Sequence, residues 1–229
     1  MGLFYDYYYI VLVLPAMLIA VAAQIYLKSI YKKMSNVNSL RGLTGAQAAY
    51  QVLAHYGITD VRIEQVAGTL SDHFDPRDKV IRLSAPIYRG SSIAAIGIAC
   101  HEAGHAAQHN QGYLPIKLRN ALVPVTNLGS ALGIPLALVG FMLGWQPLIT
   151  FGLVLYAAIA VFQLVTLPVE FNASRRAIRV IDETNLLEAE EQLGAKQVLV
   201  AAALTYVAAL VVSLANLLRL ILRFNSRRN

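Results

Sequence analysis

Residues 101–105 read His101-Glu102-Ala103-Gly104-His105, and this stretch predicts a metal-binding helix around which the rest of the chain is arranged. Positions four apart on an α-helix are separated by about 6 Å of rise and about 40° of rotation, so both imidazoles can bind one zinc ion at about 2.0–2.1 Å. Glu102 lies about 100° around the helix from His101, where a carboxylate can take a proton from zinc-activated water. We therefore predict His101 and His105 as metal ligands, Zn²⁺ as the cofactor and Glu102 as the catalytic base.

The segment before this motif favours a buried helix. Residues 91–100 contain a serine cap followed by an apolar run. The alternative is an ordinary helix with two surface histidines, but burial would place both imidazoles in the interior, where they need polar partners. Cys100 is the only cysteine, which excludes an intrachain disulfide, and we predict it as a small buried residue.

The composition is that of a membrane protein. Of the 229 residues, 57% are hydrophobic and only 14% are charged. The formal net charge is +6. No interleaving of basic and aromatic residues suggests a nucleic-acid groove, so we interpret the basic residues as topology determinants and lipid-headgroup contacts. The expected partners are the lipid bilayer and no nucleic acid, and the oligomeric state cannot be read from the sequence.

Four nearly uncharged runs predict membrane-spanning helices at residues 4–27, 121–143, 147–169 and 197–218. Lys28, Lys32 and Lys33 follow the first run, so the positive-inside rule places the N-terminus outside and the next segment in the cytoplasm. A cleaved signal peptide is the alternative for the first run, but such peptides begin with basic residues. The second and third runs form a hairpin that returns the chain to the cytoplasmic side.

The polar ends of the last span are harder to place. Four spans put the C-terminus outside, yet this end carries Arg219, Arg223, Arg227 and Arg228. Either these late charges weigh less than the early ones, or the last ten residues lie along the membrane interface; both alternatives stand. Before this span, residues 182–192 form an acidic linker or helix, and we expect three surface carboxylates there, at Glu188, Glu190 and Glu191.

The polar segment 35–118 predicts a compact helix-and-sheet unit around the motif. Residues 39–56 have a helical apolar face, and residues 61–66 and 79–84 alternate as half-buried strands, with a loop at 71–78 between them. An exposed strand edge beside the metal could hold an extended peptide through backbone hydrogen bonds. We predict residues 79–84 as that edge, with Val80, Ile81, Arg82 and Leu83 as its substrate-contacting residues.

Glu170 is the candidate third ligand. The hairpin delivers it to the cytoplasmic side, where two histidines and one glutamate would complete a catalytic zinc site with an open fourth position. The alternative is that Glu170 only pairs with Arg175 or Arg176 at the interface.

Two further histidines lie near the motif in the sequence. His73 could stabilise an oxyanion, or it could be a loop histidine that bonds the Asp-rich turn. His109 lies about 12 Å along the helix from His101, too far to share one ion. A structural zinc site with four protein ligands, with His73 or His109 as the fourth, would favour a non-catalytic membrane scaffold. An intramembrane protease of the site-2 type is a further alternative, but the apolar run before His101 spans only about nine residues.

Four strings of this chain resemble the YugP-like neutral zinc metallopeptidases of bacterial membranes and are more distantly similar to the HtpX-type membrane proteases. They are Ser-Asp-His-Phe-Asp-Pro-Arg at 71–77, His-Glu-Ala-Gly-His-Ala-Ala-Gln-His at 101–109, residues 121–130, and Leu-Pro-Val-Glu-Phe-Asn-Ala-Ser-Arg-Arg-Ala at 167–177. The resemblance implies a gluzincin-type site with zinc on His101, His105 and Glu170 and with Glu102 as base. The HtpX-type pattern has an aspartate four residues after the glutamate ligand, which would orient a ligand histidine. Here that position is Ser174, and Asn172 could substitute for it.

Together these observations predict a mainly α membrane protein with about four transmembrane helices and a small α+β gluzincin-like zinc peptidase unit. The expected domains are an anchor (1–33), the peptidase unit (34–120), a transmembrane hairpin (121–169), a glutamate-ligand helix and linker (170–195) and a final transmembrane helix with a basic tail (196–229). We expect a zinc-dependent endopeptidase of the bacterial cytoplasmic (inner) membrane, with its active site on the cytoplasmic side. Its substrates would be peptides or proteins, membrane proteins among them.

Overall fold

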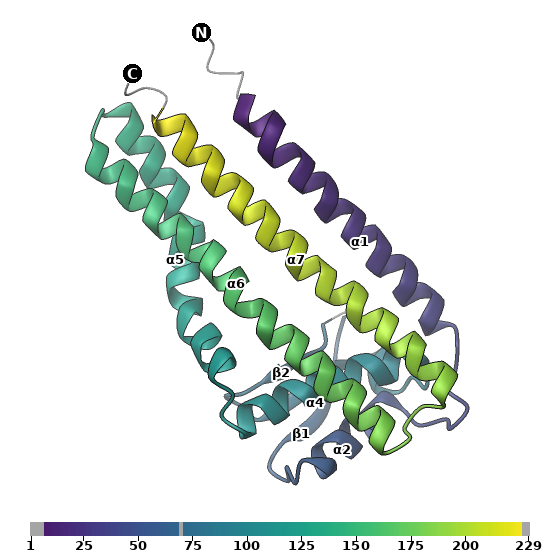
Figure 1. The fold of residues 1–229 in the computed structure, drawn as a ribbon. Coiled ribbons are helices and arrows are strands. Elements are labelled where there is room, and N and C mark those ends of the chain that lie inside the picture. The colour runs from purple at the N-terminus through teal and green to yellow at the C-terminus, as the bar shows by residue number, and fades with distance from the viewer. Residues whose placement is uncertain (1–6, 69–70, 226–229) are drawn as a thin grey trace. The chain divides into compact units, whose positions relative to one another are not determined.

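The computed structural model of the chain describes residues 7–68 and 71–225 and contains two compact units. We call residues 1–24, 118–167 and 205–229 the span unit, and residues 25–117 and 168–204 the motif unit. The fold is mainly helical, with one small sheet (Figure 1). Arg227 and Arg228 of the predicted basic tail lie outside the described residues.

Four helices are long and apolar enough to cross a membrane within the described ranges, as the sequence predicts. A π-helical turn, Tyr9–Val13, leads into α1, Leu14–Ser35. The others are α5, Leu114–Met142, α6, Gln146–Glu183, and α7, Ala189–Asn225. Helices α5, α6 and α7 are each longer than the apolar runs that predicted them. Thus α6 contains Pro168 and carries Glu170 on the same helix as the third span.

In the span unit, glycines let α5 and α6 approach closely. A Cβ atom added to Gly129 would lie within 2.2 Å of the backbone oxygen of Leu155, and one added to Gly152 within 2.5 Å of the backbone nitrogen of Ala137. Neither distance is compatible with a side chain. Small residues spaced along facing helices permit this backbone contact in membranes, where apolar burial gives little driving force. The hairpin is therefore held by backbone packing.

We expect Gly152→Ala to destabilise the hairpin by about 1–3 kcal/mol, because backbone atoms cannot move aside as side chains can. The measurement is the unfolding midpoint of the detergent-solubilised protein. Ala131→Leu is the control, since Ala131 is exposed on α5 and gains more atoms. Equal unfolding midpoints for Gly152→Ala and wild type would contradict the packing account.

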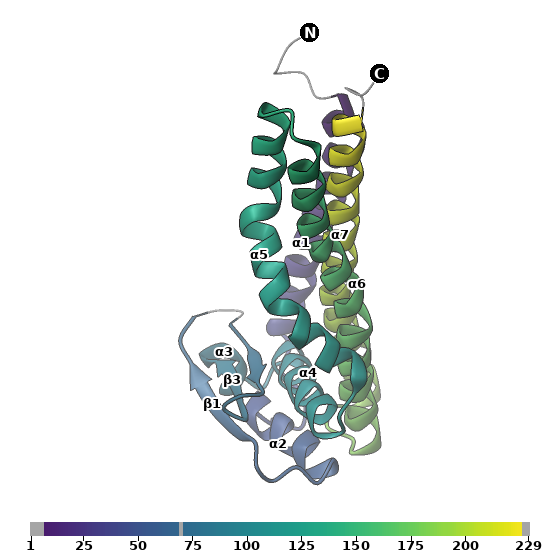
Figure 2. The ribbon, with the colours of Figure 1, turned by 90° about the vertical axis from the view of Figure 1, so that its left-hand side faces the viewer.

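The motif unit combines three helices and three strands with parts of the long helices α1, α6 and α7. Its elements are α2, Gly45–His55, β1, Arg62–Val66, β2, His73–Asp75, β3, Val80–Ser84, α3, Ala85–Tyr88, and α4, Ile93–Asn110. Helix α2 and the strands β2 and β3 contact α4. Strand β1 lies on the outer side of β3 (Figure 2). Helix α2 begins later than predicted because Thr44 and Gln47 form a capping box. Helix α4 begins where expected, since the Ser92 hydroxyl accepts a hydrogen bond from the Ala95 amide.

The sheet order corrects the predicted substrate edge. The order is β1-β3-β2, so β3 is the central strand, parallel to β1 and antiparallel to β2. Val80, Ile81 and Leu83 are fully buried, and the prediction that Val80, Ile81, Arg82 and Leu83 form an exposed edge is wrong. The prediction of a loop at residues 71–78 is also wrong, because β2 lies there and is only three residues long. Arg82 of β3 forms ion pairs with Asp75 of β2 and with Asp78 in the turn that follows.

Glu191 is also placed differently from the prediction. It is 8% exposed, not a surface residue. Its carboxylate accepts hydrogen bonds from the backbone amides of Leu40 (2.7 Å) and Glu188 (2.9 Å). A carboxylate at the N-terminus of α7 also interacts favourably with the helix dipole. Glu191 therefore ties the start of α7 to the segment that precedes α2.

Candidate metal centre

Helices α4 and α6 bring His101, His105 and Glu170 together in the motif unit. The Glu170 Oε2 atom lies 3.2 Å from His101 Nε2 and 3.5 Å from His105 Nε2. The ligand atoms of all three residues lie within 4.8 Å of one another. Glu170 is 2% exposed and His105 is 8% exposed, so the carboxylate and one imidazole are withdrawn from water. Helix α6 makes this possible because it continues unbroken past its uncharged run to Glu170, its first charged residue.

Gln108 determines which nitrogen of His105 faces Glu170. Its amide nitrogen donates hydrogen bonds to the backbone oxygen of Val169 (2.8 Å) and to Asn172 Oδ1 (3.0 Å). Because the Val169 carbonyl can only accept, the amide oxygen of Gln108 must be the atom that faces His105 Nδ1, at 3.0 Å. His105 therefore carries a proton on Nδ1 and presents the lone pair of Nε2 to Glu170.

Ser174 stands in the same relation to His101. Its hydroxyl oxygen lies 3.1 Å from His101 Nδ1 and can accept a hydrogen bond from it. With Nδ1 in contact with Ser174, the other ring nitrogen of His101, Nε2, faces Glu170. Both residues that the HtpX resemblance suggested therefore support the site, Ser174 directly and Asn172 through Gln108.

The donor set fits a zinc ion. Two atoms bound to one tetrahedral zinc at about 2.0–2.1 Å are about 3.4 Å apart, which agrees with the separations of Glu170 Oε2 from the two imidazole nitrogens. In the neutral form with a proton on Nδ1, each imidazole offers an Nε2 lone pair beside the carboxylate oxygen of Glu170. A set of two imidazoles and one carboxylate is typical of catalytic zinc.

Glu102 lies beside this cluster in a buried position. It is 9% exposed on α4. Burial disfavours the charged form of His105, but the hydrogen bond to Glu170 and the charges of Glu102 and Glu170 outweigh it and raise the pKa of His105.

The backbones of α4 and α6 touch at Gly104. A Cβ atom there would lie 2.7 Å from the backbone oxygen of Ala173, so the second variable position of the motif must be glycine for the helices to meet. Cys100 is fully buried in the same core, as predicted, and burial raises the pKa of its thiol, which disfavours a thiolate ligand.

The other predicted histidines are not in the cluster. Phe74 contacts the His109 ring, with centroids 5.8 Å apart, and neighbouring strand residues point to opposite faces, so His73 points away from α4. His73 Nδ1 lies 2.8 Å from the Ser71 backbone oxygen, as expected of a histidine that bonds within its own loop. His109 lies one to two turns beyond His105 against β2, and neither histidine joins the ligand group found among the described residues.

The role of Gln108 was not predicted from the sequence. The available signal was spacing, because a residue three positions after His105 lies next to it on a helix. The identity of the second partner, Val169 on α6, could not be found from spacing within α4.

Comparisons with known proteins agree with this chemistry. The family described as "putative neutral zinc metallopeptidase" matches residues 9–225. A relative from Bacillus subtilis (strain 168), named "Putative membrane protease YugP", is 45% identical over 221 residues, which cover 96% of this chain and 98% of the relative. No solved structure matches the chain significantly.

We expect Gln108→Leu to weaken zinc binding by about 10–100-fold, because His105 loses the acceptor that fixes its tautomer. The measurement is competition for zinc with a chromophoric chelator in detergent. Gln51→Leu on α2 is the control, since Gln51 is exposed and away from the cluster. Wild-type affinity in a folded Gln108→Leu protein would mean that the amide does not orient the ligand.

Proposed function

Because the chain belongs to this family of neutral zinc metallopeptidases, we propose that it is a zinc-dependent endopeptidase of the bacterial cytoplasmic membrane with its active site on the cytoplasmic side. The observation that carries the proposal is the convergence of His101 Nε2, His105 Nε2 and Glu170 Oε2 beside Glu102. Three protein ligands leave a fourth position for a reactant, as in catalytic zinc sites, whereas structural sites are closed by four. The arrangement of a motif helix and a glutamate on a later helix supports a gluzincin-like unit.

Different residues of the site have different roles in hydrolysis. A zinc ion held by the cluster supplies Lewis-acid polarisation of the carbonyl and makes water acidic enough to ionise near neutral pH. Glu102 takes the proton of the attacking water and passes it to the nitrogen of the leaving amine. Gln108 and Ser174 keep the imidazoles oriented throughout, and the surrounding apolar core limits access of bulk water.

An extended substrate has one suitable strand beside the motif helix. Strand β2 is an outer strand of the sheet, and Phe74 connects it to α4 through His109. A peptide could add to the free side of β2 by backbone hydrogen bonds. This assignment replaces the edge predicted at residues 79–84. Since Glu170 directly follows an uncharged run of α6, substrates would be segments of membrane proteins close to the bilayer surface.

The membrane position favours this function over cleavage within the bilayer. Helix α4 is not one of the four candidate spans found in the described ranges. An intramembrane protease of the site-2 type carries its motif on a spanning helix. The apolar part of α4 is too short to be such a helix.

We expect Glu102→Gln to retain zinc and to lose cleavage by about 10²–10⁴-fold, because glutamine has nearly the same shape but cannot accept a proton. Zinc content by elemental analysis and cleavage of candidate membrane proteins in proteoliposomes are measured together. Full proteolysis by Glu102→Gln would remove this residue from the mechanism.

We expect Glu170→Gln to lose bound zinc as His101→Ala does, because the neutral amide is a poor ligand for a divalent cation. Glu183→Gln, on the same helix and exposed, is the control. Undiminished zinc in Glu170→Gln would assign the third ligand to another residue.

A further inference from the structure

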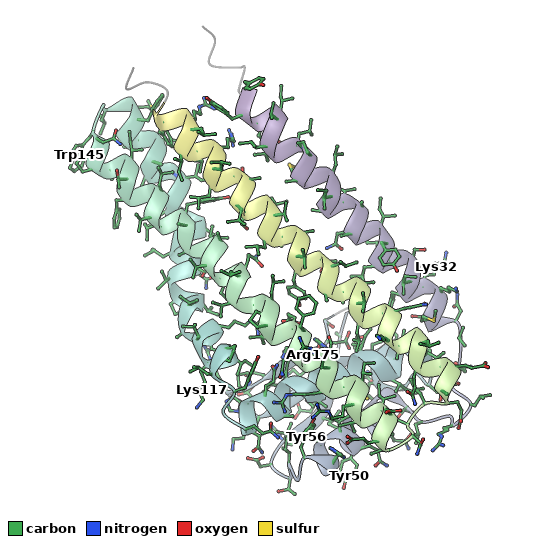
Figure 3. All side chains as sticks on the ribbon, viewed as in Figure 1. Lys32, Tyr50, Tyr56, Lys117, Trp145 and Arg175 are labelled. Carbon is green, nitrogen blue, oxygen red and sulfur yellow. The ribbon has the colours of Figure 1, made fainter. Side chains whose placement is uncertain are left out.

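A groove of about 490 Å³ lies between α6 and α7 in the motif unit. Its α6 side is a helical stripe that runs from Phe171 through Arg175 and Ile178 to Asp182, and its α7 side runs from Lys196 through Val200 to Ala203. Residues three and four apart share one helix face, so the two stripes face each other along several turns. Arg175 lies on α6 next to α7 (Figure 3).

The two ends of the groove differ in polarity. Phe171, Val200 and Ala203 form the end nearest the uncharged runs of the two helices, and Leu199 continues this apolar lining. Arg179, Lys196 and Asp182 lie one to three turns farther along the helices, away from those runs. The groove therefore passes from apolar to cationic in the same direction in which a bilayer passes from acyl chains to headgroups.

The cations of the groove are not paired with any other residue that the structure describes. Among the described residues, Arg175, Arg179 and Lys196 make no ion pair and no side-chain hydrogen bond, and only one carboxylate, Asp182, lines the groove with them. The neighbouring Arg176 differs, since it donates hydrogen bonds to Asn172 and Gln111. A groove lined by three unpaired cations and by apolar side chains matches a ligand that has both an anionic and an apolar part.

We propose that this groove binds an anionic phospholipid of the cytoplasmic leaflet. The phosphate lies among Arg175, Arg179 and Lys196, and an acyl chain lies along Phe171, Leu199 and Val200. Guanidinium groups match phosphate oxygens in a bidentate geometry, and each juxtamembrane cation adds attraction for anionic lipid. A soluble phosphate would use the cations but leave the apolar floor exposed to water.

The lipid site adjoins the metal centre without being part of it. Ser174 lines the groove and also bonds His101 Nδ1. The bound lipid would thus lie one hydrogen bond away from a metal ligand. Lipid binding requires neither zinc nor peptidase activity, so its test is independent of the proposed function.

The test is native mass spectrometry of the full-length protein in detergent, titrated with phosphatidylglycerol or with phosphatidylcholine. We expect wild type to bind one phosphatidylglycerol with about tenfold preference over phosphatidylcholine. The triple variant Arg175→Gln/Arg179→Gln/Lys196→Gln should lose this preference. The matched control is Lys28→Gln/Lys32→Gln/Lys33→Gln, which removes the same charge from exposed positions in the C-terminal part of α1, outside the groove.

Four outcomes would overturn the proposal or one of its contacts. An undiminished preference in the groove triple would place the lipid elsewhere. Equal losses in the two triples would mean that net charge, and not this groove, attracts the lipid. Displacement of phosphatidylglycerol by millimolar inorganic phosphate would assign the cations to a soluble anion. Val200→Asn, which keeps every cation, should weaken phosphatidylglycerol binding, and an unchanged affinity would remove the acyl-chain contact.

Discussion

The candidate metal centre depends on three potential ligand atoms that are held close together in a buried position. Two imidazole nitrogens and a carboxylate oxygen repel one another unless a proton or a cation lies between them, and burial strengthens that repulsion. The protein holds them there through residues that never reach the cation. Gln108 is fixed by a backbone carbonyl that can only accept, and it thereby fixes the tautomer of His105. The apolar core that packs around α4, and the contact of Ser174 with His101, also hold the side chains of the site in place.

The sequence predicts the candidate site and the spans better than the tertiary contacts through which the residues meet. Spacing along one helix identifies His101, Glu102 and His105, and the uncharged runs identify the four candidate spans, because both signals are local. Strand order is not local. The alternation of residues 79–84 predicts a strand but cannot show that three residues around Phe74 would pair with it and bury it. Likewise Glu191 lies in an acidic stretch that is typical of a protein surface. Its carboxylate is buried because the fold brings two backbone amides close enough to donate hydrogen bonds to it.

The basic C-terminal end of α7 need not oppose the topology that the early lysines indicate. In the span unit the Arg219 guanidinium lies 5.1 Å from the centroid of the Tyr9 ring. A cation over an aromatic face gains stabilisation from the ring quadrupole. Arg219 is therefore accounted for by a contact between α7 and the start of α1, which the positive-inside rule does not consider. By contrast, Lys28, Lys32 and Lys33 are exposed and free to act as topology signals.

Gly104 has a consequence for how such proteins can diverge. Motif searches treat the third and fourth positions of the pentapeptide as interchangeable letters, yet here the fourth is fixed by the carbonyl of Ala173 on another helix. Any larger residue would push α4 and α6 apart and lengthen the distances on which ion capture depends. Substitutions of Gly104 are therefore disfavoured, although the motif pattern allows any residue at this position. Descendants could change it only together with a compensating shift of the helix that bears Glu170.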